Sequence, residues 1–128
     1  MDSPGAIRLH RKLLAWQESI ALAKQVYAMT AKFPRDDQFA LSSQMKRAAI
    51  SVPSNIAEGA ARGSKREFVH FLAIARGSLS ELDTQLTLAC KLDFASDITP
   101  IEAQLDHVFR LLNGLIGSTR RDSTPIAE

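Results

Sequence analysis

Residues 51–59 read SVPSNIAEG and interrupt a stretch that otherwise favours one long amphipathic helix. Pro53 removes a backbone donor and crowds the carbonyl four residues earlier, which costs roughly 3 kcal/mol in a helix interior. Asn55 and Gly59 lower helix propensity further. Residues that are this unfavourable for a helix need a compensating role in packing or in contacts. The segment is therefore predicted to kink its helix and to fix how that helix packs on the next one.

Hydrophobic residues recur at spacings of three and four along most of the chain, which is typical of amphipathic helices. SKRE at 64–67 and TPIE at 99–102 are capping boxes that mark two helix starts. Gly63 is a natural left-handed helix end, and Pro34 ends the first helix. The first predicted helix spans 13–33, and the second begins between 37 and 42 and ends at about 62. The third spans about 64–91, and the fourth runs from 99 to about 117.

Four helices with short connections predict an all-α fold, an antiparallel up-down-up-down four-helix bundle. The expected organisation is an N-terminal arm at 1–12, the bundle at 13–118 and a flexible tail at 119–128. The chain has 128 residues, 45% of them hydrophobic and 23% charged, as expected for one globular domain. No apolar run reaches the ~20 residues that cross a membrane, no secretion signal is evident, and Cys90 is the single cysteine. We therefore expect a cytoplasmic protein without membrane contact.

The hydrophobic surface exceeds what one bundle needs. Helix one carries two adjacent apolar stripes, and helix three has Phe71 and Ile74 outside its main seam. A four-helix bundle uses one stripe per helix, so the surplus is expected to be buried against further copies of the chain. The first stripe of helix one contains Leu13, Trp16, Ile20, Ala23 and Tyr27, and the second contains Leu22, Val26, Met29 and Phe33.

The sequence offers little for catalysis or metal binding. EFVH at 67–70 matches one half of a di-metal carboxylate site, but it occurs once, and Glu67 is explained by helix capping. The remaining histidines have no cysteine or histidine at ligand spacing. No glycine-rich phosphate loop or nucleophile elbow occurs. We therefore expect a protein that is not an enzyme and that holds no metal or cofactor.

A polar stripe on helix two is expected to meet helix three. Ser51, Asn55 and Glu58 are spaced by four and three and so share one helix face. Gly77 and Ser78 interrupt the bulky sequence of helix three, which predicts a close crossing with buried hydrogen bonds. Two interpretations of these residues stay open, a structural polar network and a ligand-contacting site. If they contact a ligand, the protein could be an enzyme whose buried polar site consists of Asn55, Glu58 and Ser78. The predicted network consists of Ser51, Asn55, Glu58, Ser78 and Glu81.

Charge is unevenly distributed, although the net charge is only +2. Residues 42–76 contain six basic and two acidic residues, whereas 77–109 contain one basic and six acidic residues. This asymmetry favours nucleic-acid contact or complementary charge between neighbouring subunits. The turn at Gly63 brings cations beside the positive N-terminal end of helix three. The candidate nucleic-acid-binding residues are Lys46, Arg47, Arg62, Lys65 and Arg66.

SVPSNIAEG, with QMKRAA before it and ARGSKREFVHFLAIARGSLSEL after it, closely resembles a family of small bacterial four-helix bundles that includes proteins encoded within intervening sequences of 23S ribosomal RNA genes. The chain is also similar to the accessory variability proteins of diversity-generating retroelements. The resemblance covers roughly residues 13–92, and Val52 and Ala15 depart mildly from the family pattern. The positions that match the pattern are Ser51, Pro53, Asn55, Glu58, Gly59, Arg62, Phe68, Gly77, Ser78 and Glu81.

The resemblance implies an assembly more than an activity. It implies a ring-like homopentamer and, through the retroelement proteins, contact of basic surfaces with RNA or DNA and with a reverse transcriptase. The leading hypothesis is a non-catalytic, homo-oligomeric bundle that acts as a nucleic-acid or ribonucleoprotein-associated adaptor. The alternative is a protein-binding scaffold that meets an acidic partner and has no nucleic-acid role.

Overall fold

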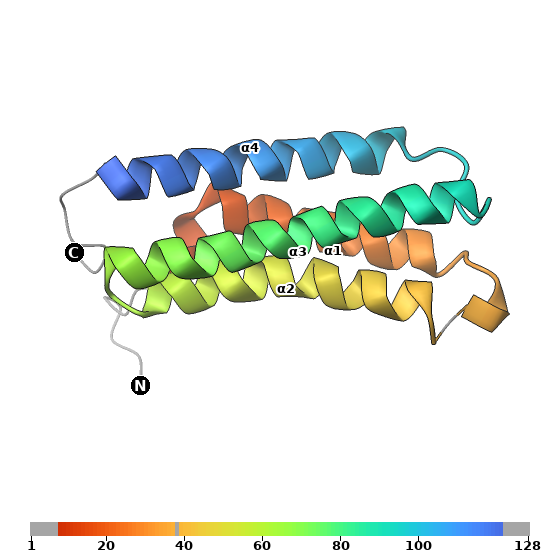
Figure 1. Ribbon diagram of the computed structural model, residues 1–128, viewed down its shortest axis with the longest axis horizontal. Coiled ribbons are helices and arrows are strands. Elements are labelled where there is room, and N and C mark those ends of the chain that lie inside the picture. The colour runs from red at the N-terminus through yellow and green to blue at the C-terminus, as the bar shows by residue number, and fades with distance from the viewer. Residues whose placement is uncertain (1–7, 38, 122–128) are drawn as a thin grey trace.

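The computed structural model describes residues 8–37 and 39–121, and the described chain is helical without strands. Figure 1 shows four long helices that run alternately in opposite directions. Each packs against two others, α1 against α2 and α4, and α3 against α2 and α4. The predicted all-α four-helix bundle is therefore confirmed. The helices are α1 (Leu14–Thr30), α2 (Leu41–Ala61), α3 (Lys65–Lys91) and α4 (Thr99–Arg121), with short 3-10 helices η1 (Leu9–Lys12) and η2 (Arg35–Asp37).

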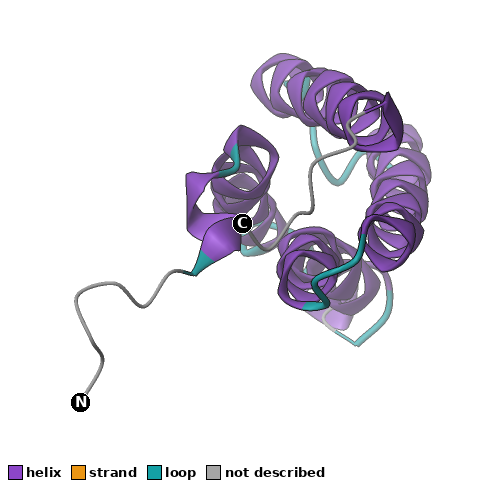
Figure 2. Cartoon of the chain, turned by 90° about the vertical axis from the view of Figure 1, so that its left-hand side faces the viewer, coloured by secondary structure: helices purple, strands orange, loops and turns teal. Residues whose placement is uncertain are grey.

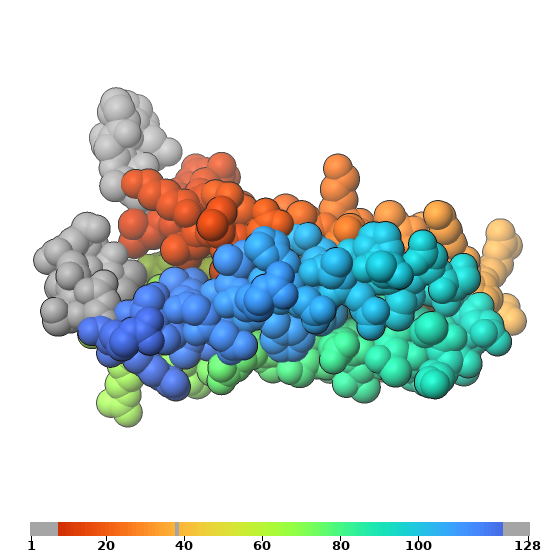
Figure 3. All heavy atoms as spheres, turned by 90° about the horizontal axis from the view of Figure 1, so that it is seen from above, coloured from red at the N-terminus to blue at the C-terminus, as the bar shows by residue number. Residues whose placement is uncertain are grey.

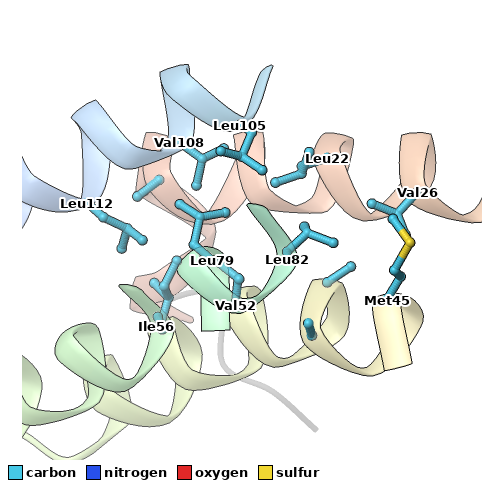
Figure 4. Close-up of a cluster of buried hydrophobic side chains, with 14 of the residues drawn as sticks. Leu22, Val26, Met45, Val52, Ile56, Leu79, Leu82, Leu105, Val108 and Leu112 are labelled. Carbon is cyan, nitrogen blue, oxygen red and sulfur yellow. The ribbon is translucent and has the colours of Figure 1, made fainter. Parts of the chain in front are cut away.

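The core lies along the bundle axis, and every long helix contributes one face to it. Side chains from all four helices meet in the interior (Figure 4), and α4 lies between α1 and α3 when the molecule is seen from above (Figure 3). Burial of each large apolar side chain contributes roughly 1.5–3 kcal/mol relative to exposure. Buried core residues include Leu22, Val26, Met45, Val52, Ile56, Leu79, Leu82, Leu105, Val108 and Leu112.

The face of α1 that enters the core differs from the first predicted stripe. The buried positions are Ala15, Ser19, Leu22, Val26 and Thr30, whereas Ile20 and Tyr27 of the first stripe are each 44% exposed. Two polar residues can occupy core positions because their own helix satisfies them. The Ser19 hydroxyl donates to the Trp16 carbonyl at 2.8 Å, and the Thr30 hydroxyl donates to the Val26 carbonyl at 2.9 Å.

The residues that end α2 and begin α3 adopt the expected conformations, whereas the start of α4 differs. Gly63 has a φ of +79°, a left-handed conformation that glycine adopts without steric cost. The Ser64 hydroxyl oxygen accepts the backbone N–H of Glu67 at 3.2 Å, so the predicted cap of α3 is confirmed. At the start of α4, by contrast, the backbone N–H of Thr99 donates to the Asp97 carboxylate at 3.2 Å. The helix begins at Thr99 itself, one residue before the predicted first position at Pro100.

The ends of two helices and the structure of the N-terminal segment differ from expectation. α1 stops at Thr30, before the predicted end at Phe33. α4 continues past Gly117 to Arg121 with Thr119 buried, so 119–121 belong to the helix rather than to a flexible tail. Within the expected arm, residues 9–12 form η1, which packs on α1 and α2. The remaining parts of the expected arm and tail, 1–7 and 122–128, lie outside the described residues.

Candidate functional site

A small polar cluster joins the middle of α2 to the middle of α3. The hydroxyl oxygens of Ser51 and Ser78 lie 2.8 Å apart and share a hydrogen bond. The Asn55 amide donates to the Ser51 carbonyl at 2.8 Å and to the Ser51 hydroxyl at 2.9 Å. All three side chains are partly buried. The structure thus brings Ser51, Asn55 and Ser78 together between the helices, where they tie one helix to the other.

The two carboxylates of the expected network lie outside this cluster. Glu58 is exposed and forms an ion pair with Arg62 at 2.8 Å. Glu81 is also exposed. It lines a shallow hollow of about 320 Å³ together with Gln44, Arg47, Ala48 and Ser51. Glu58 therefore does not supply the buried hydrogen bond expected at the helix crossing, and Glu81 lies exposed beside Ser51.

The close approach of α2 and α3 occurs at Gly59 rather than at Gly77. A Cβ atom at Gly59 would lie 2.8 Å from the Cβ of Phe71, which is closer than such atoms come, and 3.1 Å from the Phe68 ring, which is a tight contact. Gly77 has no atom within 4 Å of the same hypothetical Cβ and is exposed. The absence of a side chain at Gly59 lets the two phenylalanines of α3 seat against α2. Pro53 is accommodated within α2, where it is buried.

The five candidate nucleic-acid-binding residues do not form one patch. Lys46 is half-buried on the α1 side, with its amino group 5.3 Å from the centre of the Tyr27 ring. Arg47 borders the hollow on the opposite, α3 side of the helix. Because a helix rises 1.5 Å per residue, Lys46 lies about 24 Å along α2 from Arg62. Lys46 and Arg47 are therefore separated from the other three candidates.

Arg62 lies at the turn between α2 and α3 but is already paired. Its guanidinium group contacts the Glu58 carboxylate at 2.8 Å and the Glu67 carboxylate at 3.5 Å, and it lies 4.9 Å from the centre of the Phe71 ring. These pairs are exposed and therefore individually weak. Lys65 and Arg66 follow in the first turn of α3, so they are the candidates best placed for an external anion.

Sequence reasoning missed basic residues from two other elements that reach the same end of the bundle. The α2–α3 turn, the last turn of α4 and η1 all lie toward this end (Figures 1 and 3). We call it the basic end. Residues 8–13, 58–67 and 117–121 contain only two acidic residues, Glu58 and Glu67, both paired with Arg62. The basic residues of this end are Arg8, Arg11, Lys12, Arg62, Lys65, Arg66, Arg120 and Arg121.

The opposite end of the bundle has the opposite charge balance. Residues 31–41 and 88–102 contain three basic residues against five acidic ones. The antiparallel topology of four helices predicts that the N-terminal segment, the second connection and the end of the fourth helix meet. The sequence contains that signal, but the prediction of an arm at 1–12 and a tail at 119–128 leaves the basic residues of both segments out of the candidate site.

Within residues 8–37 and 39–121, no group of three or more histidine, cysteine or acidic residues is arranged to hold a metal ion. His70, the histidine of the EFVH motif, is exposed and packs edge-on against Phe71 at a ring-centre distance of 5.3 Å. Cys90 is a half-buried free thiol. Among the same residues no helix has the length and apolar character needed to cross a membrane.

The family model described as 23S rRNA-intervening sequence protein matches residues 11–114. The chain belongs to this family. The matched region of this 23S rRNA-intervening sequence family member includes the polar cluster, Gly59 and the α2–α3 turn, whereas Arg120 and Arg121 lie beyond it.

The fold of this family member is similar to that of a solved protein. It matches a crystal structure from Bacteroides thetaiotaomicron, described as a protein of unknown function from the S23 ribosomal protein family, with a TM-score of 0.73 and 23% identity. The match covers 80% of this chain and 98% of the other. No curated protein matches the sequence. The similarity supports the four-helix fold.

Proposed function

We propose that this protein is a non-catalytic, homo-oligomeric adaptor that binds nucleic acid, RNA in particular, through the basic end of the bundle. The observation that carries the proposal is the convergence of eight basic residues from three elements, while the two carboxylates that the structure describes at this end are both paired to one arginine. Phosphate groups are recognised by such clusters without regard to sequence. The N-terminal end of α3 adds the positive end of its dipole to the same place.

The family description supports RNA as the nucleic acid, because it refers to a sequence that intervenes in 23S ribosomal RNA. An acidic protein surface could also satisfy a basic cluster, which keeps the scaffold function as the competing proposal. A protein partner such as a reverse transcriptase would belong to either function. The two proposals differ in one measurable respect, which is direct binding of RNA by the purified protein.

The test compares two double variants that lose the same charge at different places. Lys65→Gln with Arg66→Gln removes cations from the basic end, and Lys46→Gln with Arg47→Gln removes them from the middle of α2. We expect the first to weaken RNA binding on the order of tenfold or more at low salt and to reduce the salt dependence by about two released counterions. The second should change both quantities little.

Fluorescence anisotropy with a labelled RNA, at several salt concentrations, measures both quantities. Competition with unlabelled RNA and DNA of unrelated sequence reports whether recognition is sequence-tolerant. Absence of RNA binding at low salt by the correctly folded wild-type protein would reject the adaptor function in favour of the scaffold. Equal losses in the two double variants would reject the basic end as the binding surface.

A further inference from the structure

Arg62 belongs to the basic end, but the hydrogen-bonding edges of its guanidinium group are already occupied. Its Nε–H donates to Oε2 of Glu58 at 3.0 Å, and its Nη2 lies 2.8 Å from the same oxygen. Its Nη1 lies 3.5 Å from Oε1 of Glu67. The N–H groups of a guanidinium lie in the plane of the group. Both carboxylates therefore contact its rim and leave its two flat faces to other partners.

The local structure holds the two carboxylates in place. Glu58 precedes Arg62 by four residues, one turn earlier on the same side of α2. Glu67 belongs to the cap of α3, where its backbone N–H donates to the Ser64 hydroxyl and its Oε2 accepts from that hydroxyl at 3.4 Å. The group thus combines one positive charge with two negative charges. It would repel a phosphate, so phosphate contacts at this end belong to the other cations.

One face of the guanidinium group is covered by the Phe71 ring. The Cζ atom of Arg62 lies over this ring, 4.9 Å from its centre, within the range of cation–π contacts. Phe71 reaches this position because Gly59 has no side chain, whose Cβ would lie 2.8 Å from that of Phe71. Arg62 follows Gly59 by three residues and so lies on the same side of α2. The close approach of α2 and α3 therefore sets an aromatic ring against Arg62.

The other face of the guanidinium group is open. The Arg62 side chain remains 44% exposed, although its rim and one face are in contact with neighbours. Gly63 contributes no side chain beside it, and nothing lies within 4 Å of a hypothetical Cβ there. Figure 2 looks onto this end of the bundle, where the loop between α2 and α3 joins the two helix ends. His70, which packs edge-on against Phe71, is exposed as well.

We propose that an unpaired RNA base stacks on the open face of Arg62, so that the basic end recognises single-stranded RNA. This inference rests on the RNA-binding part of the proposed function and names the form of RNA that is bound. Unpaired bases stack on aromatic rings and on guanidinium planes, and such stacking accepts any base because every base has a π-face. A duplex keeps its bases inside and would present phosphates to Glu58 and Glu67.

The test replaces Arg62 by lysine, which keeps the positive charge and loses the flat face. Arg110→Lys makes the same change at an exposed arginine of α4 outside the basic end and serves as the control. Three labelled probes are compared by fluorescence anisotropy. They are a short single-stranded RNA, the same RNA paired with its complement, and an abasic ribose-phosphate oligomer of the same length.

We expect Arg62→Lys to weaken binding of the single-stranded RNA about fivefold or more. Binding of the duplex and of the abasic oligomer should change less than about twofold, and the salt dependence should stay the same because the charge is kept. Arg110→Lys should bind all three probes as the wild type does. Arg62→Tyr, which restores a flat face without the charge, should regain the ratio of single-strand to duplex affinity that Arg62→Lys loses.

Each contrary outcome has its own meaning. Equal losses for all three probes would show that Arg62 contacts phosphate or supports the turn, and would overturn the proposal. Single-strand binding by Arg62→Lys equal to that of a wild type that binds RNA would also overturn it, and would leave the open face to an aromatic side chain of a protein partner. A wild type that binds none of the probes at low salt would reject the adaptor function itself, and the stacked base with it.

Discussion

At the scale of single residues, Gly59 and Gly77 occupy similar positions in long helices but have opposite surroundings. An alanine at Gly59 would bring its Cβ to 2.8 Å from the Phe71 Cβ, so α2 and α3 would have to separate. We expect Gly59→Ala to lower the free energy of unfolding by about 1–3 kcal/mol, the range of overpacked cores. Gly77→Ala meets open space and should raise it by about 0.5–1 kcal/mol.

Chemical denaturation of the two variants measures this difference, and each serves as the control for the other. Performing it at several protein concentrations shows whether assembly contributes, because only an oligomer has a stability that depends on concentration. Similar effects of both substitutions would show that the α2–α3 contact at Gly59 tolerates a methyl group and that the chain can relax there.

At the scale of elements, the hydrogen bond between Ser51 and Ser78 couples α2 to α3. Ser51→Ala and Ser78→Ala each remove one hydroxyl of the 2.8 Å contact, while the Asn55 amide keeps the Ser51 carbonyl as a partner. A double-mutant cycle should therefore give a coupling free energy of about 0.5–1.5 kcal/mol. Glu58→Gln, which alters only an exposed ion pair, should change stability by less than about 1 kcal/mol. Additive effects of the two serine substitutions would remove the bond from the forces that hold the helices together.

Local signals made the helices predictable, whereas contacts between helices were less so. The cap at Ser64 and the left-handed Gly63 depend on residues within one turn, so the sequence specified them. Gly59 was assigned a packing role, but its true partners, Phe68 and Phe71, depend on the register of two helices. Leu22 and Val26 of the core face of α1 lie in the second predicted stripe, but its serine and threonine were not predicted, because hydrophobic periodicity gives no weight to a serine or threonine that bonds to its own backbone.

At the scale of the whole molecule, charge is separated along the bundle axis. The basic end combines residues from three parts of the sequence, which run from Arg8 to Arg121. The opposite end is acidic. Only topology brings these residues together, which explains why the sequence identified Lys65 and Arg66 but not Arg120 and Arg121. In the proposed homo-oligomer the copies are related by symmetry, so every basic end has an equivalent place in the assembly. The cations of successive copies then form a repeated surface.

Repetition of the basic end predicts that RNA affinity depends on RNA length in the oligomer but not in a monomer. A single basic end makes few phosphate contacts and is strongly weakened by salt, whereas an RNA that reaches several copies binds the later ones intramolecularly. We expect the wild type to bind a long single-stranded RNA 10²-fold or more tightly than an RNA that reaches only one subunit. Ile50→Glu places a charge on an exposed apolar residue of α2 and retains every residue of the basic end. We expect it to weaken assembly and to bind both RNAs with the affinity that the wild type shows for the short one. Anisotropy titrations of both proteins with both RNAs measure this, and Leu14→Glu provides the control with an exposed apolar residue replaced by the same charge. Equal length dependence in Ile50→Glu and Leu14→Glu would separate RNA binding from the assembly.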